Sequence, residues 1–207
     1  MYDSLYKDFN PTRFDATQWA GIAKAGGMKY LVLTAKHCDG FLLWHSKASD
    51  YTIEATPFRR DVCAELSQAA RKQNLRIGWY FSPMDWRDPD FRTERNAAFL
   101  GRMKAELREL LGNYGPIDLL WFDGCGSDGH QYDWPRIVAE IRRLQPSLMI
   151  FNMADPDMRW VGNEAGISPY PAWQAVKAKD ARSGVATSEH SDPDGDVWLP
   201  MEMDTTL

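Results

Sequence analysis

Residues 117–124 read Ile117-Asp118-Leu119-Leu120-Trp121-Phe122-Asp123-Gly124, an almost continuous apolar run that ends in an aspartate and a glycine. A run of this kind is typical of a strand buried on both faces, and its polar end is typical of a turn. The same order of apolar and then polar residues recurs at residues 28–40, 75–86 and 148–164. Segments with the apolar spacing of helices separate these runs, so the pattern indicates a parallel sheet covered by helices.

The expected elements alternate along the chain. We predict strands at residues 28–34, 75–81, 117–122, 148–152 and 197–202. We predict helices at residues 14–26, 60–73, 91–111 and 134–144, and a short helix at residues 171–179. Asp133 is the expected N-cap of the fourth helix, and the many charges of residues 91–111 indicate an exposed helix face.

Two α/β folds fit this alternation, the (β/α)8 TIM barrel and the doubly wound open sheet. The nucleotide-binding form of the open sheet needs a glycine-rich loop directly after an early strand, whereas Gly26 and Gly27 precede a strand here. A barrel carries its functional residues on the loops that follow its strands, which is where the polar residues of this chain gather. We therefore predict one barrel-type domain over residues 1–207.

The predicted barrel is partial or compacted. About five to six βα units are visible, whereas a closed barrel has eight and typically ~250 residues. Either the chain is a fragment, or a shortened chain forms a homo-oligomer in which another copy covers the open edges of the sheet.

The composition excludes several classes of partner. The net charge of −5 and the absence of a basic stripe exclude nucleic acid, and no apolar run is long enough to cross a membrane. Cys38, Cys63 and Cys125 are too few for a disulfide framework and lack the spacing of metal ligands, so we expect no metal and no cofactor. The nine tryptophans fit either a bulky core or a site in which aromatic rings stack on sugars.

Asp123 is the first candidate for chemistry, because it stands between an apolar strand and Gly124. An aspartate there either begins a turn or presents its carboxylate at the mouth of the barrel. A retaining glycosidase needs a second carboxyl group roughly 5 Å from the first. Candidates near other predicted strand ends are Asp39, Asp85, Glu164, Glu189 and Glu202.

Five ordered motifs give the chain a specific resemblance. Lys36-His37-Cys38-Asp39-Gly40-Phe41 resembles the KHHDGF signature of glycoside hydrolase family 29, the α-L-fucosidases. The segments at residues 9–19, 60–62, 78–86 and 121–124 resemble the same family, in its order and with its spacing. The matches run from about Leu5 to Glu202. The resemblance implies a retaining fucosidase that acts on fucosylated oligosaccharides or glycoconjugates.

The resemblance also implies roles for residues. Asp123 matches the nucleophile, and His37 matches a histidine that binds fucose hydroxyls. Cys38 departs from the pattern, because the family usually has a second sugar-binding histidine there, and a thiol is a poor substitute. Trp44 and Tyr80 match aromatic residues that line the fucose pocket of the family. Trp86 lies in the matching segment at residues 78–86 and is a further candidate for contact with the sugar.

Two glutamates compete for the role of general acid/base. Residues 159–166 resemble a loop of the subgroup that acts on α1,3/4-fucosylated glycans, in which a glutamate is the acid/base, so Glu164 is our choice. Glu202 is the alternative, and Arg159 is expected to hold a carboxylate or a sugar hydroxyl.

The family's first strands carry another sugar-binding histidine, and no part of this sequence matches them. Two functions therefore stay open, an active fucosidase and an inactive or fucose-binding, lectin-like remnant. Family members are often secreted, periplasmic or lysosomal, and residues 1–6 lack the basic and apolar parts of a signal peptide, so the compartment is not predicted.

Overall fold

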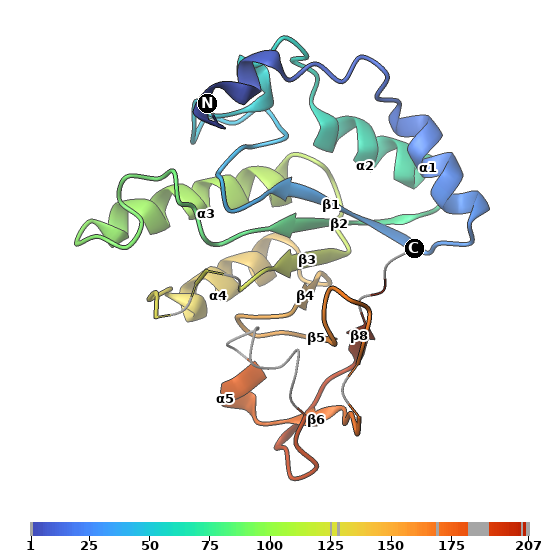
Figure 1. Ribbon diagram of the computed structural model, residues 1–207, viewed down its shortest axis with the longest axis vertical. Coiled ribbons are helices and arrows are strands. Elements are labelled where there is room, and N and C mark those ends of the chain that lie inside the picture. The colour runs from blue at the N-terminus through green and yellow to red at the C-terminus, as the bar shows by residue number, and fades with distance from the viewer. Residues whose placement is uncertain are drawn as a thin grey trace.

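A parallel four-stranded sheet forms the centre of the molecule (Figure 1). The computed structural model describes residues 2–124, 126–127, 129–168, 170–181, 191–203 and 205, without the side chain of Asp3. The strands are β1 (Tyr30–Lys36), β2 (Arg76–Phe81), β3 (Leu119–Phe122) and β4 (Met149–Phe151), in the order β1-β2-β3-β4. Each strand pairs with the next one along the chain, which is the strand order of a barrel wall.

Four helices accompany the sheet. They are α1 (Ala16–Ala25), α2 (Val62–Lys72), α3 (Asn96–Gly112) and α4 (Trp134–Leu144), and two 3-10 helices occupy Tyr2–Asp8 (η1) and Ile53–Ala55 (η2). Asp15 and Asp61 begin α1 and α2 as N-caps, because their carboxylates accept backbone N–H groups of the first turn at 2.8–3.0 Å. Asp133 is the N-cap residue of α4 as predicted, but its carboxylate makes no capping bond and instead lies 3.4 Å from Arg136.

The core lies between the sheet and its helices. It runs from Phe14 to Ala154 and includes the fully buried rings of Trp79, Phe81 and Phe122. The indole N–H of Trp79 donates to the carbonyl oxygen of Leu110 at 3.2 Å and so ties β2 to α3. The apolar runs of the sequence therefore become strands because their side chains fill this core.

A second part follows β4 and lies below the sheet in Figure 1. It contains β5 (Arg159–Val161) beside β8 (Met201–Met203), β6 (Ala175–Val176) beside β7 (Val197–Trp198), and the short α5 (Ala178–Ala181). A bridge between Phe151 and Met158 joins β5 to the β4 edge of the sheet. The hydroxyl of Tyr30, the first residue of β1, donates to the carboxylate of Glu202 in β8, so the last strand returns to the amino end of the first.

The predicted α/β class and its parallel sheet are confirmed, with three corrections. The described residues contain three complete βα units, at β1–α2, β2–α3 and β3–α4, and not five to six. The short helix predicted at residues 171–179 is mostly irregular, with β6 at Ala175–Val176 and the start of α5 at Ala178, and the last predicted strand divides into β7 and β8. The charged face of α3 is not wholly exposed, because Glu106 is buried. Within the described ranges, no helix combines the length and the apolar character that crossing a membrane requires.

Candidate active site

Three strand ends bring His37, Tyr80 and Asp123 together. The sheet is parallel, and its register pairs Thr34 with Tyr80 and Tyr80 with Trp121. His37 follows β1 and Asp123 follows β3, while Tyr80 lies near the end of β2 between them. The strand order therefore places these side chains on one edge of the sheet, as in a barrel mouth.

Tyr80 is the centre of this group. Its hydroxyl donates a hydrogen bond to Oδ2 of Asp123, and its ring stacks on the imidazole of His37 at a centroid distance of 5.5 Å and an angle of 5°. The ring of Tyr80 is almost buried, and the indole of Trp121 meets it edge-on at 5.2 Å. A packed phenol can therefore hold the Asp123 carboxylate in one orientation, while His37 stays exposed to a ligand.

Residues after His37 form the rim of this edge. Nδ1 of His37 lies 2.9 Å from Sγ of Cys38, and the half-buried thiol thus occupies the place where the family pattern has a histidine. Trp86 is 56% exposed, and its backbone N–H donates to the carbonyl oxygen of Cys38 at 3.0 Å. The hydroxyl of Tyr2 donates to Asp39 at 2.7 Å, and this bond is the main reason that the pKa of Tyr2 is raised to about 12.

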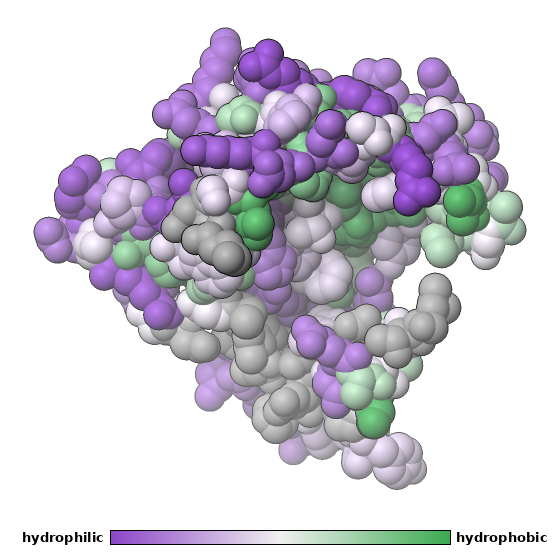
Figure 2. Space-filling model, turned by 45° about the horizontal axis from the view of Figure 1, so that its top comes forward, coloured by the Kyte–Doolittle hydropathy of each residue, from purple (hydrophilic) through white to green (hydrophobic). Residues whose placement is uncertain are grey.

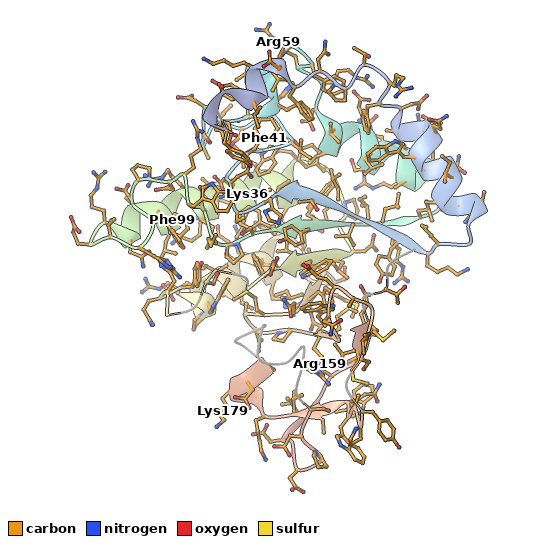
Figure 3. All side chains as sticks on the ribbon, in the orientation of Figure 1. Lys36, Phe41, Arg59, Phe99, Arg159 and Lys179 are labelled. Carbon is orange, nitrogen blue, oxygen red and sulfur yellow. The ribbon has the colours of Figure 1, made fainter. Side chains whose placement is uncertain are left out.

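Two predicted sugar-binding residues are buried away from this edge. Trp44 has no exposed surface, and its indole N–H donates to Oε2 of Glu109 at 2.9 Å. Arg159 is also fully buried, and its guanidinium donates to the carbonyl oxygen of Trp173 at 2.7 Å. Figure 3 shows Arg159 in the second part of the molecule, far below Lys36. Burial lowers the pKa of Arg159, and these placements argue against direct sugar contact by either side chain.

The two candidate acid/base residues lie in different places. Glu164 is exposed in the loop after β5, where the side-chain oxygen of Asn163 accepts the N–H groups of Ala165 and Ile167 at 3.0 and 3.3 Å. Glu202 instead binds Tyr30, at the amino end of β1. Six residue steps at about 3.3 Å separate that end from Lys36, so Glu202 contacts a point roughly 20 Å from the edge that carries His37. This argues against Glu202 as the acid/base. Glu189 lies outside the described residues.

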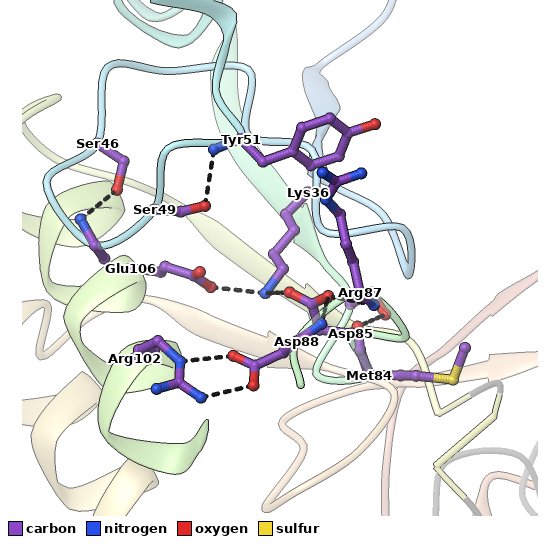
Figure 4. Close-up of polar contacts among 12 residues, drawn as sticks. Lys36, Ser46, Ser49, Tyr51, Met84, Asp85, Arg87, Asp88, Arg102 and Glu106 are labelled. Carbon is purple, nitrogen blue, oxygen red and sulfur yellow. Dashed lines mark hydrogen bonds and ion pairs between the residues drawn. The ribbon is translucent and has the colours of Figure 1, made fainter. Parts of the chain in front are cut away.

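The sequence reasoning missed a buried ion cluster directly behind the site (Figure 4). The ammonium group of Lys36 lies 2.7 Å from Glu106 of α3 and 3.0 Å from Asp85 in the loop after β2. Two members stood in motifs of the sequence, Lys36 before His37 and Asp85 at residues 78–86, but nothing in the charge pattern of α3 separates Glu106 from its exposed neighbours.

The cavity beside this cluster is not at the Asp123 carboxylate. Its volume is about 500 Å³, and its walls include Asp85, Arg102 and Glu106. These three side chains are engaged in ion pairs, Asp85 and Glu106 with Lys36, and Arg102 with Asp88 and Asp90. The candidate site is therefore the edge of the sheet at Asp123 and not this cavity. Figure 2 shows that the molecule is also hollowed between its upper part and its C-terminal part. Within the described ranges, no three His, Cys, Asp or Glu side chains are grouped so that they could hold a metal ion.

Comparisons with known proteins identify the family to which the chain is similar. The family model described as alpha-L-fucosidase matches residues 1–190. The chain is 37% identical over 210 residues to alpha-L-fucosidase 1 of Arabidopsis thaliana, covering 96% of this chain and 41% of the plant protein. It is 40% identical over 140 residues to human plasma alpha-L-fucosidase, covering 61% of this chain and 30% of the human protein.

Solved structures give the same result. A glycoside hydrolase family 29 member from an unknown rumen bacterium aligns with a TM-score of 0.79 and 33% identity, covering 94% of this chain and 38% of that one. An alpha-L-fucosidase of Bacteroides thetaiotaomicron, trapped as a covalent intermediate with 2-fluoro-fucosyl fluoride, aligns with a TM-score of 0.68 and 34% identity, covering 73% and 37%. The fold is thus part of a family 29 catalytic barrel, and the chain spans about two fifths of the length of its plant relative.

Proposed function

The chain belongs to the α-L-fucosidase family, and we propose that it acts as a retaining fucosidase on terminal α-L-fucosyl groups of oligosaccharides or glycoconjugates, with Asp123 as nucleophile. The observation that carries the proposal is the hydrogen bond from Tyr80 to Asp123 at the ends of β2 and β3, with His37 stacked on the same tyrosine ring. The chain covers 41% of the length of its plant relative. Fucosidase activity of this chain is therefore proposed and not taken over from the relative.

In the first step, the Asp123 carboxylate attacks the anomeric carbon and the bond from that carbon to the glycosidic oxygen breaks. The hydroxyl of Tyr80 holds the carboxylate so that one oxygen faces the sugar, and this removes part of the orientational cost of attack. Glu164 gives its proton to the departing oxygen. The products of this step are a fucosyl ester on Asp123 and the free leaving group.

In the second step, water attacks the anomeric carbon of the ester. Glu164, now ionised, takes a proton from this water, and the bond between the sugar and Asp123 breaks. Two inversions give net retention, so fucose leaves with the α configuration that it had in the substrate.

Exposed groups around the carboxylate hold the sugar in this proposal. The imidazole of His37 offers a donor or an acceptor to fucose hydroxyls, and the ring of Trp86 offers an apolar face. Cys38 gives a weaker contact than the histidine of the family pattern, so we expect lower affinity for fucose than in relatives with both histidines.

The test is release of the phenol from an aryl α-L-fucoside by the full chain. We expect turnover, and we expect Asp123→Ala to reduce it by at least about 10³-fold, because the proposed ester forms on this carboxylate. Asp61→Ala is the matched control, since that carboxylate caps α2 and takes no part in the proposed chemistry. Size-exclusion chromatography of the same samples reports whether activity belongs to a monomer or to a homo-oligomer.

Each outcome distinguishes the two open functions. Turnover that Asp123→Ala abolishes supports the retaining fucosidase. Binding of fucose without turnover supports the lectin-like remnant, and turnover that survives Asp123→Ala means that Asp123 is not the nucleophile.

A further inference from the structure

The loop that carries His37 is fixed by the buried ion cluster of Lys36, Asp85 and Glu106. Lys36 is the last residue of β1 and immediately precedes His37, and its side chain is 1% exposed. Its ammonium group also lies 5.1 Å from the centre of the Phe81 ring in β2. The cluster thus joins the end of β1 to the β2 strand, to the loop after it and to α3, all behind the proposed sugar-binding edge.

Asp85 and its neighbour Trp86 make two further contacts with the loop that carries His37. The backbone N–H of Trp86 donates to the carbonyl oxygen of Cys38 at 3.0 Å. Gly40 has a φ of +77°, and a Cβ at that position would lie 2.6 Å from the carboxylate of Asp85, so the backbone rests directly on this side chain. Asp85 in turn accepts the N–H groups of Arg87 and Asp88 at 3.0 Å, which fixes its own position.

Burying the three charges of the cluster has a desolvation cost that a purely stabilising contact would not require. One buried cation faces two buried carboxylates, and apolar side chains of similar size give equal or greater stability at such places. Burial raises the pKa of Glu106, although the charge of Lys36 opposes the shift. For Lys36, burial alone would lower the pKa, but Glu106 and Asp85 outweigh it and raise the value. Charged groups with fixed geometry can instead hold the neighbouring backbone in a single arrangement.

A second glutamate of α3 provides an internal contrast. Glu109 lies one turn after Glu106 and holds residues further along the same loop, through Trp44 at 2.9 Å, the Ser46 hydroxyl at 2.6 Å and the Lys47 N–H at 2.8 Å. Helix α3 therefore holds this loop twice, once beside His37 and once at a distance from it.

We propose that the cluster of Lys36, Asp85 and Glu106 positions His37 against Tyr80 for contact with the sugar. This proposal rests on the proposed function of the same site. Lys36 and Glu106 act through His37 and do not touch the substrate, so they are positioning residues.

The test compares two variants of the cluster with one control. Lys36→Met combined with Glu106→Leu replaces the buried pair by apolar groups and leaves the Asp85 carboxylate with the N–H groups of Arg87 and Asp88 as its partners. Asp85→Ala keeps the ion pair between Lys36 and Glu106 and removes the carboxylate that packs against Gly40. This variant provides the test if the double variant does not fold. Glu109→Gln weakens only the distant attachment. The measurements are the nitrogen resonances of the His37 imidazole through a pH titration, and KM and kcat for an aryl α-L-fucoside.

We expect both cluster variants to change the His37 imidazole resonances and to raise KM about tenfold, the size of one well-oriented hydrogen bond, while kcat stays within about threefold. Glu109→Gln is expected to leave the resonances and KM unchanged. Unchanged His37 resonances in a folded cluster variant would overturn the proposal. If the unaltered chain shows no turnover, the proposed function fails, but the His37 resonances still test the positioning.

Discussion

The two parts of the molecule differ in how firmly they hold the two proposed catalytic carboxyl groups. The first part, up to Ala154, has a continuous core, and its β1 and β2 strands are seven and six residues long. The second part has strands of two or three residues, and among its described residues the buried hydrophobic ones are Val161, Val176 and Ala181. Asp123 stands on the first part and Glu164 on the second.

The difference shows how this chain divides the work of a two-carboxyl site. Asp123 is held by a buried tyrosine on a packed sheet, whereas the Glu164 loop is shaped by local bonds to Asn163. Regions with few buried contacts open at a lower free-energy cost than packed cores. We therefore expect the position of the nucleophile to be preorganised and the position of the acid/base to depend on bound substrate.

The largest expected effect concerns the second part. Glu164→Ala should lower turnover of a natural fucosylated glycan about 10²–10⁴-fold, because its leaving group needs a proton, and should lower turnover of an aryl fucoside much less. With the aryl fucoside, azide should restore part of the lost activity and give a fucosyl azide of α configuration, since it attacks the ester on Asp123 in place of the activated water. Full activity of Glu164→Ala on the glycan would refute the assignment, and Glu202→Ala is the matched comparison.

A core substitution tests the difference in packing. Leu120→Ala in β3 removes a side chain without exposed surface and should lower the free energy of unfolding by about 2–5 kcal/mol. Val176→Ala in β6 removes two carbon atoms from a buried side chain and should cost about 1–2 kcal/mol, less per carbon atom than Leu120→Ala, because β6 is two residues long and Val176 lies outside the main core. Urea unfolding measures both, and equal losses at the two sites would mean that the parts are equally well packed.

The smallest expected effect is a pH dependence within the first part. Burial alone would raise the pKa of Asp88, but its bonds to Arg102 at 2.6 Å outweigh burial and lower the value. The stabilisation is therefore present above the unfolded pKa of about 3.9 and is lost as the pH falls through the lower folded value.

Asp88→Asn should accordingly cost less than about 1 kcal/mol at neutral pH, since Arg102 is 36% exposed and the pair is screened. The difference from the unaltered chain should vanish in strong acid. Asp192→Asn, whose partner Lys177 lies 3.7 Å away in the second part, should show no difference at any pH. Thermal unfolding between pH 2 and 7 checks both, and a difference at Asp88 that grows in acid would contradict this account.

Prediction from the sequence succeeded better in the first part of the molecule than in the second. Helix α4 was predicted at Trp134–Leu144, and β3 was placed to within two residues, because apolar periodicity reports burial in a core. Strands β5 and β6 were missed, since two or three residues carry no period and form only because chain from elsewhere lies beside them.

The site residues divide in another way. The placement of Asp123, Tyr80 and His37 at one edge of the sheet was predictable, because each lies within a motif at or directly after the end of a predicted strand. The burial of Trp44 and Arg159 was not, because the position of a loop side chain depends on its partners, here Glu109 and the carbonyl oxygen of Trp173. The partners of Lys36 are 49 and 70 residues away in the sequence, since they are Asp85 (85 − 36) and Glu106 (106 − 36), and local pattern cannot report such contacts.

The most direct test of the central claim is covalent labelling of the nucleophile. The full chain is incubated with 2-fluoro-fucosyl fluoride, and intact-protein and peptide mass spectrometry locate the label. We predict one 2-fluoro-fucosyl group per chain, on the peptide that contains Asp123, and no label on Asp123→Ala. A label on any other carboxylate of a folded chain would contradict the account.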